Sequence, residues 1–330
     1  MSLPVLICDD SAMARKQIAR ALPGDWDIQI TFASHGGEAL EAIQAGHGDI
    51  LFLDLNMPVM DGYEVLEAIR DQDLPTMVIV VSADVQQPAY DRVKALGAMD
   101  FICKPVTADE IVTLLQRYGV LESTHGQSPA ELMRFDTIRI DLQEMLQEVV
   151  NIAMGEAGDR LSHLLNTFVH LPVPKVHFTT FAELANVVAA RRFDSLSAVT
   201  EGFIGNQITG EAILLVDQSS FCQLVQLFQY EQTTCEVSDV EVLMDLSSVI
   251  TGACLQNIAT QLDLQLSYSH PVMLGRNQSA AQFLQGARAA QQVVAVEVNY
   301  SIPEHAIECD LLIVFTHDSI DALKSRADCF

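Results

Sequence analysis

Charged and hydroxyl side chains follow directly on short apolar runs in the first third of the sequence. Asp9 and Asp10 follow one run, and Asp54, Ser82 and Lys104 each follow or end another. Carboxylate oxygens are ligands that Mg²⁺ prefers, and a Mg²⁺ site usually keeps waters and a substrate phosphate. Lysine and metal together could neutralise a phosphoryl group in transfer, with Asp54 as the nucleophile. The residue types therefore predict phosphoryl-transfer chemistry with bound Mg²⁺.

Each of these residues also has an ordinary structural explanation. Asp9 and Asp10 precede Ser11 and could cap a helix that starts there. Ser82 could be a turn residue, and Lys104 could be a solvated charge. Taken singly the residues are weak evidence, but their combination in this order favours the chemical interpretation.

The spacing of apolar residues predicts the elements that must position these side chains. Short apolar runs alternate with helical periodicity, which predicts a five-stranded parallel sheet with helices on both faces. The carboxyl ends of parallel strands lie at one edge of such a sheet, so the polar residues should converge there. The expected strands are 5–8, 28–32, 50–53, 77–81 and 99–103.

On these residues, the segment from 4 to about 121 resembles a response-regulator receiver domain of the CheY type, which implies a flavodoxin-like, doubly wound α/β fold. Met-Pro-Val-Met-Asp-Gly at 57–62 also matches that family. The resemblance implies a histidine kinase as phosphodonor and slow self-catalysed dephosphorylation. It implies that Asp54 is the phosphoacceptor and that Lys104 contacts the phosphate. It implies that Mg²⁺ is bound by Asp9, Asp10, Asp54 and the Asn56 backbone carbonyl. It further implies that Ser82 and Phe101 are switch residues and that the peptide before Pro105 is cis.

A change of composition separates this first domain from the rest of the chain. Residues 122–136 lose apolar periodicity and gather Ser, Gly and Pro, which is typical of a linker. No helix-turn-helix sequence follows it. We therefore expect a receiver domain at 1–121, a linker at 122–136 and a second domain at 137–330.

The second domain contains an internal repeat. Glu148 aligns with Asp245 (245 − 148 = 97), and Pro174 aligns with Pro271 at the same shift (271 − 174 = 97). We expect an α+β domain with pseudo-two-fold symmetry and an antiparallel sheet, because consecutive strands are joined by short turns. The expected parts are repeats at about 137–233 and 234–330, helices at about 138–153 and 239–261, and strand pairs at 196–204 with 209–216 and 292–301 with 307–315.

Glu148 and Asn151 are the candidate chemical pair of this domain. Apolar residues recur at helical spacing around them, so both should project from the face opposite the buried stripe, one turn apart. An ordinary solvated helix face is the structural alternative. A carboxamide, however, offers a donor and an acceptor together and can hold a water in line with a phosphorus atom.

The helix that carries this pair resembles the CheC, CheX and FliY family of receiver phosphatases. The resemblance implies that Asn151 orients the water that attacks a phosphoaspartate, while Glu148 engages the active-site lysine of the receiver. In the second repeat Asp245 and Ser248 stand at the matching places. Because Asp is shorter and Ser lacks the two-point amide geometry, we expect that second site to be degenerate.

Composition limits the classes of partner. The formal net charge is −26, from 18 basic and 44 acidic residues, which disfavours nucleic acid and anionic lipid. The seven cysteines form no C-x-x-C pair, and no uninterrupted run reaches the length of a membrane span. We expect reduced core thiols in a cytoplasmic protein without membrane insertion.

The leading hypothesis is a two-component chemotaxis response regulator, phosphorylated on Asp54, whose second domain dephosphorylates a CheY-like receiver, in trans or on its own chain. The alternative is a phosphorylation-switched binding protein whose inactive second domain docks a chemotaxis or flagellar-switch partner. Exposure of Glu148 and Asn151 side by side would favour the phosphatase, and burial of either would favour the binding protein. A plain phosphate sink would leave residues 137–330 without a role. An oligomer is compatible with each.

Overall fold

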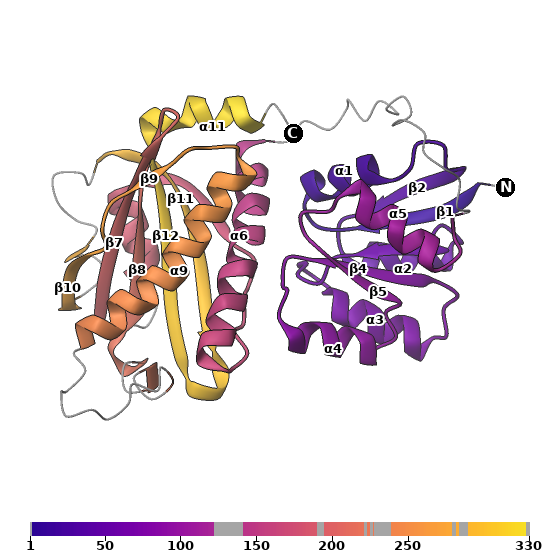
Figure 1. The fold of residues 1–330 in the computed structure, drawn as a ribbon, viewed down its shortest axis with the longest axis horizontal. Coiled ribbons are helices and arrows are strands. Elements are labelled where there is room, and N and C mark those ends of the chain that lie inside the picture. The colour runs from indigo at the N-terminus through magenta and orange to yellow at the C-terminus, as the bar shows by residue number, and fades with distance from the viewer. Residues whose placement is uncertain are drawn as a thin grey trace. The chain divides into compact units, whose positions relative to one another are not determined.

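The computed structural model describes residues 2–121, 141–189, 195–220, 223–224, 227, 239–278, 282–283 and 290–327. The chain forms two compact units, Met1–Ile140 and Asp141–Phe330 (Figure 1). The predicted linker at 122–136 and the predicted domain start at 137 lie outside the described residues.

The first unit is a five-stranded parallel sheet in the order β2-β1-β3-β4-β5. One face packs against α1 and α5 through residues such as Ile18 and Ile111. The other packs against α2, α3 and α4 through residues such as Ile43 and Val65. The predicted flavodoxin-like, doubly wound fold is therefore confirmed. Its elements are β1 (Leu3–Cys8), α1 (Ala12–Ala21), β2 (Ile28–Ala33), α2 (Gly36–Gln44), β3 (Ile50–Leu53), α3 (Gly62–Asp71), β4 (Met77–Ser82), α4 (Gln87–Ala95), β5 (Asp100–Cys103) and α5 (Ala108–Arg117).

The strands of this sheet deliver the candidate residues to one edge. All four residues of β3 are buried, as expected for a central strand covered by helices on both faces. Asp54 is the first residue after β3, Asp9 the first after β1, and Lys104 the first after β5, while Ser82 ends β4. Parallel pairing of these strands places the four residues at the same carboxyl edge.

Two backbone features shape this edge. The Lys104–Pro105 peptide is cis, as the family resemblance implied. Gly62 begins α3 directly behind Asp54, and a Cβ added there would lie 2.2 Å from the Asp54 carbonyl oxygen. Helix α3 is held at this place by a capping box between Asp61 and Glu64, whose side chains accept from each other's backbone N–H groups. Only glycine at position 62 permits so close an approach.

The described strands of the second unit form one antiparallel sheet in the order β10-β7-β8-β12-β11-β6, with β9 beside β7. The predicted antiparallel sheet and both predicted strand pairs are confirmed. Helices α6 and α9 pack side by side (Figure 1). Helix α7 packs on the sheet through Phe181 and Leu184. The elements are α6 (Leu142–Leu165), β6 (Lys175–Thr180), α7 (Phe181–Ala189), β7 (Leu196–Gly205), β8 (Ile208–Asp217), α9 (Asp239–Gln261), β9 (Ser267–Tyr268), β10 (Val272–Gln278), β11 (Gln292–Ile302), β12 (Ile307–Thr316) and α11 (Ile320–Ala327).

Helix α6 is longer than the predicted helix at 138–153. Glycines weaken a helix in isolation, but α6 continues through Gly158 because this glycine fits against Leu171, where a Cβ would lie 2.6 Å from Leu171 Cδ1. The helix ends at Asn166, which is left-handed with a φ of 50°. Packing therefore overrides propensity in the second half of α6.

By length and composition, one described helix is long and apolar enough to cross a membrane, the segment Val240–Gln261 of α9. The sequence expectation concerned uninterrupted apolar runs, and this segment is interrupted by Glu241 and Asp245, so the finding does not contradict it. Of the apolar window in α9, 61% is buried in the structure, and the helix packs along α6. A buried core helix meets the same criteria of length and hydropathy.

The described cysteines differ in exposure. Cys8, Cys254 and Cys309 are buried free thiols, as expected. Cys103 is also a reduced cysteine but is exposed, which corrects the expectation of core thiols throughout. Cys103 is the last residue of the edge strand β5, whereas Ile102 before it is buried, so the exposure is confined to the end of the strand.

Candidate functional site

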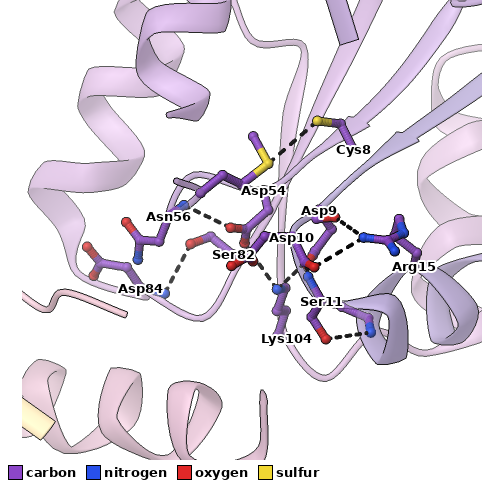
Figure 2. A network of polar contacts seen from close by, with 12 residues as sticks. Cys8, Asp9, Asp10, Ser11, Arg15, Asp54, Asn56, Ser82, Asp84 and Lys104 are labelled. Carbon is purple, nitrogen blue, oxygen red and sulfur yellow. Dashed lines mark hydrogen bonds and ion pairs between the residues drawn. The ribbon is translucent and has the colours of Figure 1, made fainter. Parts of the chain in front are cut away.

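Three buried charges meet at the carboxyl edge of the first sheet. Lys104 Nζ lies 2.8 Å from Asp9 Oδ2 and 3.1 Å from Asp54 Oδ1 (Figure 2). The exposed fractions are 0% for Asp9, 1% for Asp54 and 7% for Lys104, so the ion pairs are screened little by solvent. Two carboxylates and one ammonium leave a residual negative charge, which favours binding of a further cation.

The Asp54 carboxylate is held in a fixed orientation. Its Oδ2 accepts a hydrogen bond of 2.8 Å from the Asn56 backbone N–H, while Oδ1 faces Lys104. The Asp54 backbone N–H donates to the Cys8 carbonyl across the β1–β3 pairing. A carboxylate held at both oxygens loses little further freedom when it attacks a phosphorus atom.

Ser82 and Phe101 lie in neighbouring strands of the same unit. Ser82 is fully buried at the end of β4, and its Oγ accepts from the Asp84 backbone N–H at 3.2 Å. The Phe101 ring is partly buried and meets the Tyr90 ring of α4 edge to face at 5.9 Å. Phe101 is thus in contact with α4, and Ser82 lies at the end of β4 near Asp54 (Figure 2). The switching roles of both residues stay predictions.

The oxygen donors at this edge fit a Mg²⁺ ion that retains waters. Asp9 and Asp54 are buried carboxylates with oxygens beside Lys104, and Asp10 is partly buried next to Asp9. The contribution of the Asn56 backbone carbonyl stays a prediction. Within the described ranges no three His, Cys, Asp or Glu side chains form a ready-made metal cluster. Mg²⁺ commonly binds through one or two carboxylates, waters and phosphate oxygens, so this donor set is sufficient.

Cys8 lies beneath the acidic residues but does not extend their chemistry. Its Sγ lies 3.5 Å from Met57 Sδ. Burial, together with the nearby carboxylates of Asp9 and Asp54, raises the pKa of the Cys8 thiol. The thiol is therefore protonated and unreactive at neutral pH.

Sequence reasoning missed Arg15 of α1. Its Nη1 donates to the carbonyl oxygens of Asp9, at 2.5 Å, and Asp10, at 3.2 Å (Figure 2). The carbonyls of Asp9 and Asp10 reach the Arg15 side chain only because the chain bends between β1 and α1. The basic residue four positions after Ser11 is the signal that could have identified it.

Glu148 and Asn151 lie one turn apart on α6, as predicted, but they are not solvated. Their exposed fractions are 2% and 6%. The expectation of an exposed face is wrong, because apolar periodicity identifies the helix face that meets its own core and does not determine whether the opposite face is open. In the part of the chain that the structure describes, Asn151 Oδ1 accepts no hydrogen bond.

The matching pair on α9 differs in environment. Asp245 and Ser248 are both exposed. Ser248 Oγ donates to the Met244 carbonyl of its own helix at 2.8 Å. A hydroxyl that donates to its own helix backbone is less available to hold a reactive water, and the degeneracy of this second site stays a prediction.

Comparison with known proteins matches residues 5–116 to the family described as response regulator receiver domain. One relative is the protein-glutamate methylesterase/protein-glutamine glutaminase 2 of Koribacter versatilis, which is 38% identical over 135 residues. The match covers 37% of this chain and 37% of that protein, so this chain spans about a third of that relative's length. The first unit is a CheY-like receiver domain of the two-component type, as predicted.

Two solved structures extend the comparison. The CheX-CheY-BeF₃-Mg complex from Borrelia burgdorferi matches with 30% identity, covering 36% of this chain and 89% of that chain, with a TM-score of 0.33. FliY from Thermotoga maritima matches with 16% identity, covering 58% of this chain and 98% of that chain, with a TM-score of 0.45.

Proposed function

We propose that this chain is a response regulator that is phosphorylated on Asp54 and whose second unit hydrolyses the phosphoaspartate of a receiver domain. The observation that carries the first part is the buried arrangement of Asp9, Lys104 and Asp54, with Lys104 Nζ 2.8 Å and 3.1 Å from the two carboxylates. Such an arrangement supplies both a nucleophile and a cation for phosphoryl oxygens.

Phosphorylation of Asp54 requires one bond to form and one to break. A carboxylate oxygen of Asp54 attacks the phosphorus of a phosphohistidine in a histidine kinase, and the bond from phosphorus to the imidazole nitrogen breaks. That nitrogen keeps the bonding electron pair. Lys104 Nζ, already beside Asp54, binds a phosphoryl oxygen as its charge shifts. Mg²⁺ held by Asp9, Asp10, Asp54 and the Asn56 carbonyl would supply additional positive charge for the phosphoryl oxygens.

A pseudo-two-fold repeat is proposed as the framework of the second unit. Helices α6 and α9 begin 97 residues apart (239 − 142 = 97), as do β6 and β10 (272 − 175 = 97). In the sheet order β10-β7-β8-β12-β11-β6, each strand of the first half and its later counterpart stand at equal distances from the centre. Both observations support the repeat and make α9 an internal comparison for α6.

Hydrolysis is assigned to the α6 pair. Asn151 would hold a water through its amide and direct it at the phosphorus of a phosphoaspartate, while Glu148 would engage the receiver's lysine. The water oxygen bonds to phosphorus, the bond to the aspartate oxygen breaks, and the carboxylate leaves with its electron pair. Adjacent placement on one helical turn and the unoccupied hydrogen-bonding capacity of Asn151 Oδ1 among described residues support these roles. The substrate receiver is either a separate CheY-like protein or the chain's own Asp54.

Burial of Glu148 and Asn151 favours a second candidate function. With exposed fractions of 2% and 6%, neither side chain is accessible to a separate receiver in this conformation. A phosphorylation-switched binding protein docks a chemotaxis or flagellar-switch partner without hydrolysis. It does not need Glu148 and Asn151 to be accessible, so their burial is compatible with it. The phosphatase acting in trans requires this face of α6 to open.

Labelling tests the acceptor first. The chain is incubated with Mg²⁺ and radiolabelled acetyl phosphate, and incorporation into the wild type is compared with Asp54→Asn. We expect label on the wild-type chain, at most one phosphoryl group per chain, and none on the variant. Equal labelling of both proteins would contradict the assignment of Asp54.

Substitutions on the two helices then separate the candidate functions. Asn151→Ala and Glu148→Ala are compared with Ser248→Ala, the matched position on α9, for release of phosphate from a phosphorylated receiver and for binding to it. Loss of release in the two α6 variants alone supports the phosphatase. No release by any protein, with binding that depends on phosphorylation of Asp54, supports the binding protein instead.

A further inference from the structure

We propose that Arg15 is a positioning residue for the Mg²⁺ site, acting through the backbone of the acidic pair Asp9-Asp10. Arg15 does not touch the phosphoacceptor itself. The inference rests on the proposed metal site of the receiver and adds to it a residue outside the set of expected ligands.

The Arg15 side chain reaches back from the fourth residue of α1 to the loop before the helix. Its Nη1 donates to the Asp9 carbonyl at 2.5 Å and to the Asp10 carbonyl at 3.2 Å (Figure 2). The backbone hydrogen bonds of α1 begin at the Ser11 carbonyl, which accepts from the Arg15 N–H at 3.0 Å. One guanidinium nitrogen thus bridges two successive carbonyls that precede the helix.

Three other contacts of Asp9 act on other atoms. The Asp9 N–H donates to the Ala33 carbonyl at 3.2 Å, and Asp9 Oδ1 accepts from the Ser11 N–H at 2.9 Å. Asp9 Oδ2 faces Lys104. The Asp9 N–H is therefore held by β2, the Asp9 carboxylate is held by Ser11 and Lys104, and Arg15 holds the two carbonyls. Peptide planes fixed on both sides determine where the two carboxylates point.

The positive charge of Arg15 is electrostatically unfavourable at this position. A cation near a helix N-terminus opposes the macrodipole, and α1 has no acidic residue in its first turn. A cation beside the acidic pair also repels Mg²⁺. Electrostatics alone therefore predicts tighter Mg²⁺ binding when Arg15 is removed, whereas positioning predicts weaker binding. The two effects have opposite signs and can be told apart.

The test measures Mg²⁺ affinity of the full chain by calorimetric titration at fixed ionic strength. Arg15→Ala removes both the charge and the bridge to the two carbonyls. Arg15→Lys keeps the charge, but its Nζ is one bond closer to the backbone than Nη1 and falls short of the carbonyls. Lys16→Ala removes the same charge from the next position of α1. We expect the Kd for Mg²⁺ to rise about 10-fold in both Arg15 variants, as when a residue that supports metal ligands is lost. Lys16→Ala should leave the Kd unchanged or lower it.

Unfolding without Mg²⁺ is measured alongside, so that a loss of affinity in a folded protein is distinguished from a loss of fold. The inference would be overturned if Arg15→Lys bound Mg²⁺ with the wild-type Kd, or if Arg15→Ala bound Mg²⁺ more tightly than the wild type. Arg15 would then act through its charge alone. If the wild-type chain binds no Mg²⁺, the metal site itself is wrong, and the role of Arg15 falls with it.

Discussion

Replacing Lys104 with methionine should destabilise the first unit by about 3 kcal/mol in the absence of Mg²⁺. Lys104 Nζ lies within 3.1 Å of both Asp9 and Asp54, and all three side chains are almost completely buried. Removing one member of a buried ion pair typically costs about 3–5 kcal/mol, because the remaining charge is left uncompensated. We take the lower end because backbone N–H groups still donate to both carboxylates.

Fluorescence of Trp26 gives a direct assay in the full chain. Trp26 is the single tryptophan and packs against the apolar cluster of the first unit, so its emission reports unfolding of that unit alone. Urea unfolding is compared for the wild type, Lys104→Met and the control Lys94→Met. Lys94 forms a more exposed ion pair with Asp100 at 3.6 Å, so its loss should cost less than about 1 kcal/mol.

Addition of Mg²⁺ should reduce the difference in free energy of unfolding between the wild type and Lys104→Met. A ligand that binds only the folded state adds RT ln(1 + [L]/Kd), about 2.7 kcal/mol at 100 times the Kd. The variant should bind Mg²⁺ more tightly, because a competing cation is gone. A cost below about 1 kcal/mol, or a difference that Mg²⁺ leaves unchanged, would refute the electrostatic reasoning.

Three further changes test the surroundings of the site. Gly62→Ala should lower the free energy of unfolding by about 1–3 kcal/mol in the same Trp26 assay, because its Cβ would lie 2.2 Å from the Asp54 carbonyl oxygen; an unchanged value would contradict this. Val59→Asn should raise the free energy of unfolding by about 1 kcal/mol, because Val59 has a φ of 70°, which asparagine tolerates better than valine, and is 88% exposed. A decrease would argue against backbone strain at Val59. Burial raises the pKa of Tyr63 to about 12 from 10.0, so its neutral form stabilises the fold below about pH 10 and this contribution is lost as pH rises towards 12. The free energy of unfolding should therefore fall less between pH 9 and pH 11 in Tyr63→Phe than in the wild type. Equal decreases in the two proteins would contradict this role of Tyr63.

Much of the first unit could be predicted because its strands are buried on both faces. The run that ends at Asp54 is continuously apolar for that reason, and parallel pairing then brings Asp9 and Lys104 to the same edge. The bridge from Arg15 to the loop carbonyls could not be predicted, because it depends on how the chain bends between β1 and α1.

In the second unit, local pairings were predictable and long-range features were not. The pairs β7–β8 and β11–β12 join neighbours in sequence through short turns. The pairing of β6 with β11 links segments more than a hundred residues apart, such as Lys175 and Glu297, and no local pattern indicates it. The burial of Glu148 and Asn151 was missed for a related reason, since a helical period reports only on the face that carries apolar residues.

The rate of phosphate release from a separate phosphorylated CheY-like receiver tests the central claim most directly. The receiver is mixed with Mg²⁺ and with this chain, whose own Asp54 is first unphosphorylated and then phosphorylated. We predict that the wild type accelerates release in at least one state and that Asn151→Ala reduces the acceleration about 100-fold, as expected when an attacking water loses its alignment. Ser248→Ala should retain the full rate. No acceleration in either state, or full acceleration by Asn151→Ala, would contradict the account.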